Sequence, residues 1–155
     1  MDEPEFEAFY RATADRLRTY LYRVSGDRRL AEDLAQEAYY RFLRSGFSGS
    51  REEENARYLF KIGGNLLKDH WTDEKKITAV SIDEPAAGSS EDRLDVHTAL
   101  GALKPPERQM LWLAYAEGYS HSEIAGALGV KPASVRVLLF RAKARLLRLL
   151  QGDQR

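Results

Sequence analysis

The sequence contains no cysteine and only three histidines among its 155 residues. The missing thiols exclude disulfides and thiolate metal sites and fit a reducing compartment, and the scattered histidines do not replace them. No apolar run approaches the roughly 18 to 20 residues that span a bilayer. The acidic segment 1–5 also lacks the basic charge of a signal peptide. We therefore expect a cytoplasmic protein with no metal, no cofactor and no membrane contact.

The chain also lacks a net charge, since 24 basic residues balance 24 acidic ones. That neutrality conceals a polarised distribution of −3 over residues 1–54, +2 over 55–72, −4 over 73–98 and +5 over 99–155. The net charge gives no hint of a nucleic-acid partner, but the distribution does, because two segments are basic although the whole is neutral. The apolar content of 43% is enough for one medium core or two small ones.

Apolar side chains recur at three- and four-residue spacing, and no segment alternates long enough to indicate a sheet, so we predict an all-α protein. Expected helices cover about residues 4–25, 28–45 and 55–72, a short segment ending near 103, residues 105–117, and two segments that follow Ser120. A polar loop is expected over residues 47–54. Residues 73–92 mix charge with Pro, Gly and Ser, which predicts a linker between helical domains at 1–72 and 93–155.

The segment from Ser120 to Leu150 has the pattern of a helix-turn-helix. Ser120 and Glu123 match a capping box, Gly129 permits a tight turn, and Pro132 suits the first turn of the next helix. The small Ala125 allows the two helices to approach closely. The crossing is expected to be held by Ile124, Leu128, Val130 and Val135.

The second of these helices has no acidic residue from Lys131 to Leu150. Its expected buried stripe is Val135, Leu139, Ala142, Leu146 and Leu149, and its basic residues are Arg136, Arg141, Lys143, Arg145 and Arg148. Such a surface neutralises phosphates, and side chains near the helix start can reach base edges in a major groove. The alternative is a solvated helix of ordinary arginine content.

Two further helix faces are candidate binding surfaces. On the second helix, Asp33, Gln36, Glu37 and Tyr40 share a face opposite Ala31, Leu34, Ala38 and Phe42. This face is either solvated or a docking site for a basic protein surface. On the third helix, Tyr58, Lys61, Asn65 and Lys68 form a stripe that suits phosphates and unstacked bases. Phe60 and Trp71 beside that stripe are expected to be core residues.

Four ordered motifs resemble one family, the RNA polymerase sigma factors of the extracytoplasmic-function type. The motifs are Ala31–Glu37 followed by aromatics, Tyr58–Asn65 with Asp69, Leu103–Arg108, and Gly118–Val130 continuing into Ser134–Arg136 and Phe140–Ala142. The resemblance covers nearly the whole chain. It implies two helical domains, called regions 2 and 4 in that family, and a factor that binds core RNA polymerase and opens specific promoters.

The resemblance also assigns roles to residues. Asp33, Gln36, Glu37 and Tyr40 would dock on the clamp helices of the polymerase β′ subunit, and the second domain would rest on the β-subunit flap. Contacts to the downstream (−10) promoter element would come from Phe47, Tyr58, Lys61, Asn65 and Lys68. Contacts to the upstream (−35) element would come from Ser134, Arg136, Val137, Phe140, Arg141 and Lys143. An anti-sigma factor that covers these surfaces is a further implied partner.

The chain departs from the family pattern at Val137 and Leu138, where relatives usually carry a serine and a basic residue. We expect Leu138 to extend the buried stripe, or the helix to serve partly a protein partner. Because the sequence ends at Arg155, we expect no extra C-terminal domain.

Three other functions compete with this interpretation. A helix-turn-helix regulator that does not dock on polymerase would leave the acidic face unused. An enzyme using Ser120 and His121 lacks an orienting acid, and a phosphate-cradling glycine loop is also missing. A helical adaptor would not need an acid-free helix. We therefore expect no catalytic residue.

Overall fold

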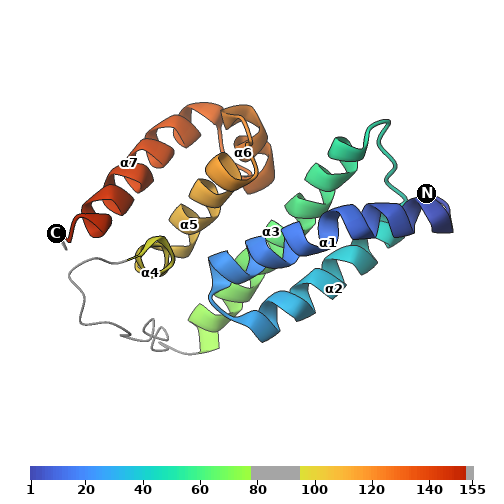
Figure 1. Ribbon diagram of the computed structural model, residues 1–155, viewed down its shortest axis with the longest axis horizontal. Coiled ribbons are helices and arrows are strands. Elements are labelled where there is room, and N and C mark those ends of the chain that lie inside the picture. Colours follow the sequence, from blue (N-terminus) through green and yellow to red (C-terminus); the bar gives the residue numbers. More distant parts are fainter. Residues whose placement is uncertain (78–94, 153–155) are drawn as a thin grey trace. The chain divides into compact units, whose positions relative to one another are not determined.

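The computed structural model describes residues 1–77 and 95–152, and every regular element in these ranges is helical (Figure 1). The predicted all-α class is confirmed. The chain divides into two compact units, Met1–Thr72 and Asp73–Arg155. None of the helices that the structure describes combines the length and the apolar character of a membrane span.

The first unit consists of α1 (Glu3–Ser25), α2 (Arg28–Ser45) and α3 (Glu52–Ile77). Gly26, in the left-handed region at φ +75°, ends α1, and the side chain of Asp27 caps α2 by accepting from the backbone N of Leu30. This two-residue connection makes α1 and α2 neighbours that pack along each other (Figure 1).

The core of the first unit lies where the three helices meet. Buried side chains come from α1 (Leu17, Tyr20, Leu21, Val24), α2 (Ala31, Ala35, Ala38, Phe42) and α3 (Leu59, Phe60, Leu67). Gly63 allows α3 to approach α1, because a Cβ atom there would lie 3.2 Å from Leu17 Cδ1. Phe60 is core as expected, whereas Trp71 is only partly buried.

Helix α3 begins three residues earlier than the sequence suggested, at Glu52, and continues to Ile77 rather than ending at residue 72. Glu52, Glu53 and Glu54 form its first turn, where carboxylates complement the positive end of the helix dipole. The expected polar loop over residues 47–54 therefore shrinks to 47–51. Of the expected linker, residues 73–77 continue α3, and residues 78–92 lie outside the described part of the chain.

The second unit contains α4 (Val96–Gly101), α5 (Pro105–Leu111), a π-helical segment η1 (Trp112–Ala116), α6 (His121–Leu128) and α7 (Pro132–Leu150). The single helix expected over residues 105–117 thus ends in a wider turn, in which the backbone N of Glu117 donates to the carbonyl of Trp112. Helices α4, α5 and α6 all pack on α7. The fully buried side chains where these helices pack together include Ala99, Leu113, Ile124, Val135 and Ala142.

The helix-turn-helix is confirmed, with two corrections. The capping box is present, since Ser120 N donates to Glu123 Oε1 (2.8 Å) and Glu123 N donates to Ser120 Oγ (3.1 Å). Gly129 has φ +70°, and this reversal leaves Val130 at the surface, 37% exposed, so Val130 does not hold the crossing. Farther along, Leu146 and Leu149 are only partly buried, because the other helices cover mainly Val135, Leu139 and Ala142.

Candidate functional site

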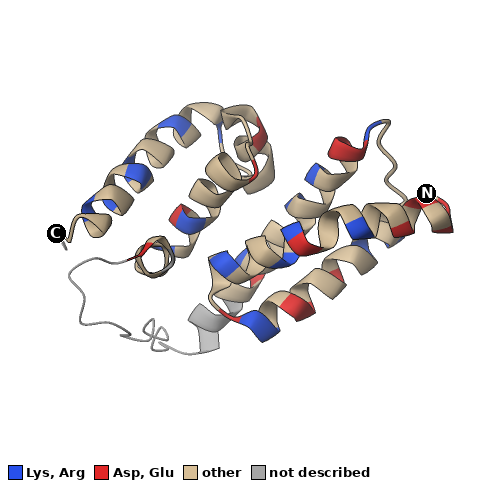
Figure 2. Cartoon of the chain, viewed as in Figure 1, with Lys and Arg blue, Asp and Glu red and all other residues tan. Residues whose placement is uncertain are grey.

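Helix α7 presents an exposed basic surface. The six residues expected there are all exposed: Ser134, Arg136, Val137, Phe140, Arg141 and Lys143. Figure 2 shows basic positions along α7 and no acidic one. Neither Arg136 nor Arg141 forms an ion pair with any residue that the structure describes. The charge of these two guanidinium groups is therefore available to a polyanion.

The same surface is partly apolar. Val137 is 48% exposed, Leu138 41% and Phe140 74%, so the expectation that Leu138 extends the core is wrong. Leu138 follows Val135 by three residues, which rotates it about 60° away from that buried position, and no helix covers it. Val137 and Leu138 line an open hollow on α7 together with Ala133 and Ser134.

On α2, the predicted acidic face is exposed. Asp33 and Gln36 are exposed, Tyr40 is 57% exposed, and the opposite face buries Ala31, Ala38 and Phe42. Glu37 Oε1 accepts from Arg41 Nε at 3.1 Å, which balances part of the negative charge. What remains is a mixed acidic, amide and aromatic surface, which is a poor binder of phosphate but suits a basic protein surface.

The stripe on α3 is also accessible. Lys61, Asn65 and Lys68 are exposed, whereas Tyr58 is half-buried. The ring of Tyr58 stacks on that of Phe47, with centroids 4.3 Å apart and planes at 14°. The structure therefore brings Phe47, from the loop before α3, onto the same surface as the α3 stripe.

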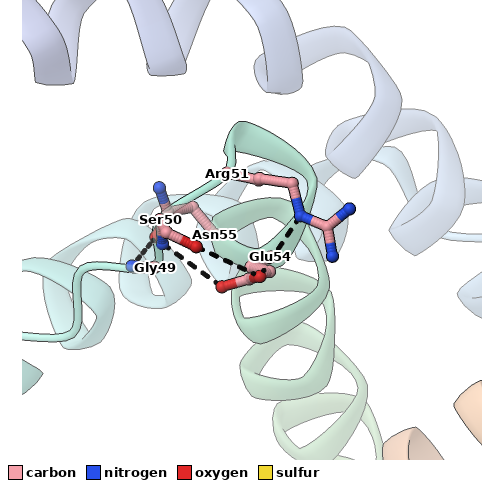
Figure 3. A network of polar contacts seen from close by, with 5 residues as sticks. All are labelled: Gly49, Ser50, Arg51, Glu54 and Asn55. Atoms are coloured by element: carbon pink, nitrogen blue, oxygen red, sulfur yellow. Dashed lines mark hydrogen bonds and ion pairs between the residues drawn. The ribbon is translucent and has the colours of Figure 1, made fainter.

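That loop is fastened to the first turns of α3 by side chains that sequence reasoning missed (Figure 3). Asn55, only 6% exposed, accepts a hydrogen bond from Gly49 N at 2.8 Å through its Oδ1 atom. Glu54 accepts from the backbone N of Ser50 at 3.2 Å and from Arg51 Nε at 3.4 Å. We call these contacts of Glu54 and Asn55 the loop clamp. An acid four residues after Ser50 and an amide six residues after Gly49 are the signal that could have indicated it.

Glycine is required at position 49 because the loop passes so close to the helix. A Cβ atom there would lie 2.8 Å from Glu54 Cβ, closer than such atoms approach in proteins. Behind the loop, Phe42 lies against Tyr58, with ring centroids 5.9 Å apart, and stacks on Phe9 at 4.9 Å. The loop and its aromatic pair therefore rest on the core of the first unit.

Deeper in that core, the hydroxyls of Thr13 and Tyr39 are hydrogen-bonded at 2.6 Å. Burial raises the pKa of Tyr39 above its ordinary value, although the hydrogen bond shared with Thr13 acts in the opposite direction. Among the described residues, no three His, Asp or Glu side chains are grouped as metal ligands.

Comparison with known protein families identifies both units. Residues 9–77 match Sigma-70 region 2, and residues 93–146 match Sigma-70, region 4. The chain belongs to the sigma-70 family of RNA polymerase sigma factors, in its extracytoplasmic-function group. Sigma factors are non-catalytic initiation factors.

Named relatives agree with this assignment. SigE of Mycolicibacterium smegmatis, an extracytoplasmic-function sigma factor, is 30% identical over 92% of this chain and 60% of its own length. The sigma factor CarQ of Myxococcus xanthus is 29% identical over 94% of this chain and 88% of its own. BldN of Streptomyces coelicolor is 26% identical over 97% of this chain and 62% of its own length. The chain thus spans about three fifths of the length of SigE and BldN.

Among solved structures, the sigma factor RpoE of Bartonella quintana, crystallised with the anti-sigma factor NepR, has the same fold. It superposes with a TM-score of 0.74 at 23% identity, covering 98% of this chain and all of RpoE.

Proposed function

We propose that this chain binds core RNA polymerase and directs it to a specific set of promoters, where it helps to open the DNA without catalysing a reaction. One observation carries the proposal: a single chain combines an exposed acidic face on α2, within the region 2 match, with an acid-free basic helix α7 in the region 4 match. The first suits a basic protein surface and the second suits DNA.

The proposed division of labour follows the two units. Residues 1–72 dock on polymerase and bind the −10 element, residues 73–92 serve as a linker, and residues 93–155 bind the −35 element. In the first unit, Asp33, Gln36, Glu37 and Tyr40 face the β′ clamp helices. Asp33, Gln36 and Tyr40 are exposed and Glu37 is half-buried on one side of α2, opposite its buried side, which supports this role.

Binding of the opened −10 element is proposed for Phe47, Tyr58, Lys61, Asn65 and Lys68. Lysines attract the backbone, the exposed amide can hydrogen-bond to a base, and the stacked Phe47–Tyr58 pair gives an aromatic surface for an unstacked base. Since the loop clamp holds the backbone N atoms of Gly49 and Ser50, much of this surface is ordered before DNA arrives.

Recognition of the −35 duplex is proposed for the exposed surface of α7, with Arg136 and Arg141 as its chief cations. The second domain is proposed to rest on the β flap. An anti-sigma partner is also proposed, because the structural neighbour RpoE was crystallised with one. We place the activity in the cytoplasm, where RNA polymerase, the partner of its relatives, works on DNA.

Charge reversal on α2 tests the central claim. The double variant Asp33→Lys, Glu37→Lys is expected to lose co-elution with core polymerase, while its helical circular dichroism stays unchanged. A matched control reverses two exposed acids on α1, Glu7→Lys and Asp15→Lys, and should still co-elute.

Normal co-elution of the α2 double variant would refute the docking assignment. Failure of the unaltered chain to co-elute with core polymerase, together with retained binding to duplex DNA, would instead favour a DNA-binding regulator that works without polymerase docking.

A further inference from the structure

The exposed apolar surface at the start of α7 is not explained by phosphate binding. We call Ala133, Val137 and Leu138 the apolar patch; these residues line the hollow together with Ser134. Val137 follows Ala133 by four residues and Leu138 follows Ser134 by four, so all four lie on adjacent ridges of the first two turns. In a helix-turn-helix, these first turns approach the base edges.

The surrounding charge indicates what covers this patch. Arg136 and Arg141 flank it, no acid occurs on α7, and neither arginine is neutralised by a described residue. A partner must therefore be anionic and must also offer apolar groups at its surface. Duplex DNA meets both requirements, because each thymine places a C5-methyl group in the major groove between two rows of phosphates.

We propose that Val137 and Leu138 recognise thymine methyl groups in the −35 element, so that this chain reads part of that element by apolar contact instead of hydrogen bonds. The inference rests on the proposed function, since it assumes that α7 enters the major groove. An aliphatic side chain can neither donate nor accept, so it distinguishes bases there chiefly through the methyl group that thymine has and cytosine lacks. Covering one methyl group is worth about a fourfold change in affinity.

Deoxyuridine provides the test, because it pairs as thymine does and lacks only the methyl group. Promoter duplexes are first selected from a randomised library with the full chain bound to core polymerase. Each thymine of the upstream element is then replaced by deoxyuridine, and affinity is measured by competition with the unmodified duplex. We expect a loss of about fourfold at one or two positions.

A double-mutant cycle assigns the contact. In Val137→Ala, which shortens the side chain, the deoxyuridine penalty should disappear at the position that Val137 covers, and Leu138→Ala should do the same at its own position. The matched control is Leu147→Ala, which removes a leucine of similar exposure (47%) from the far end of α7. This control should keep the full penalty.

Several results would overturn the proposal. Equal affinity for thymine and deoxyuridine duplexes would do so, and would instead favour a protein partner for the apolar patch. An undiminished penalty in Val137→Ala and Leu138→Ala would assign the methyl contact to other side chains. If Arg141→Ala still weakens binding in these cases, the proposed function stands and only the methyl recognition fails. If Arg141→Ala also has no effect, the placement of α7 on DNA fails with it.

Discussion

Replacing Asn55 with alanine should release the loop before α3. The Oδ1 atom of Asn55 accepts from Gly49 N at 2.8 Å, and the asparagine is only 6% exposed, so water cannot easily take its place. Removing the acceptor leaves a partly buried N–H group unpaired. Such a loss costs about 1 to 2 kcal/mol. The contacts of Glu54 are longer, between 3.2 and 3.4 Å, and exposed, so we expect them to compensate little.

Amide hydrogen exchange at Gly49 is the most direct measurement of this effect. A loss of 1 to 2 kcal/mol in the free energy of local opening corresponds to exchange faster by roughly 5- to 30-fold. The variant Glu54→Gln keeps an acceptor oxygen and should change the rate much less. Asn65→Ala removes an exposed asparagine from the same helix and should leave the Gly49 rate unchanged.

Both asparagine variants should weaken binding of single-stranded −10 DNA, but for different reasons. Asn65→Ala removes a proposed base contact, whereas Asn55→Ala acts through the loop that carries Phe47. Gly49 exchange that stays at the unaltered rate in Asn55→Ala would show that the loop does not depend on the clamp. Faster exchange with unchanged DNA affinity would show that the loop is not part of the −10 surface.

Three other predictions concern single side chains. Arg141→Ala should weaken promoter binding by roughly 1 to 3 kcal/mol and reduce its salt dependence, and equal binding at every salt concentration would contradict the placement of α7. Ser120→Ala removes the cap of α6 and should lower the free energy of unfolding, measured in urea, by about 1 kcal/mol, whereas Ser120→Asp should retain it. Because the pKa of Tyr39 is raised in the folded state, its contribution to stability is complete below pH 10.0 and is lost as the pH rises through the folded-state pKa. Tyr39→Phe should therefore lose less stability than the unaltered chain as the pH rises above 10.0, and an equal loss would show that Tyr39 does not titrate as inferred.

The features that the sequence predicts well are those determined by near neighbours in the chain. Asp27, Ser120 and Gly129 mark helix ends because a capping side chain or a left-handed glycine acts within a few residues. The sequence predicts the start of α3 three residues too late, because Glu52–Glu54 are equally compatible with a polar loop and with the first turn of a helix. Composition alone does not distinguish a loop from a helix start here. In the structure, the backbone N atoms of Glu54 and Asn55 both donate to Arg51 O, which places these residues in the first turn of the helix.

The candidate site was predictable in its residues but not in its surroundings. The three- and four-residue spacing correctly places the basic residues of α7 on its exposed surface, but it also places Leu138 beside the buried stripe. Whether a residue at the edge of a stripe is covered depends on how far the packed helices reach around α7, which spacing does not determine. Similarly, the face shared by Tyr58 and Lys61 follows from their spacing, whereas the stacking of Phe47 on Tyr58 depends on the path of a loop.

The zero net charge of the chain bears on how its two surfaces work together. A neutral protein gains little long-range attraction to DNA, and at physiological salt the cations of α7 act only within about 8 Å. The free chain should therefore bind promoters weakly. The proposed docking of α2 on polymerase would remove this disadvantage, because it would hold α7 near DNA that polymerase already contacts and so raise the effective concentration of α7 at the promoter. Charge reversal on α2 should consequently reduce promoter occupancy with core polymerase, even though no DNA contact is altered. Because the two reversals make the net charge four units more positive, the free chain should bind the same duplex at least as well as the unaltered chain does.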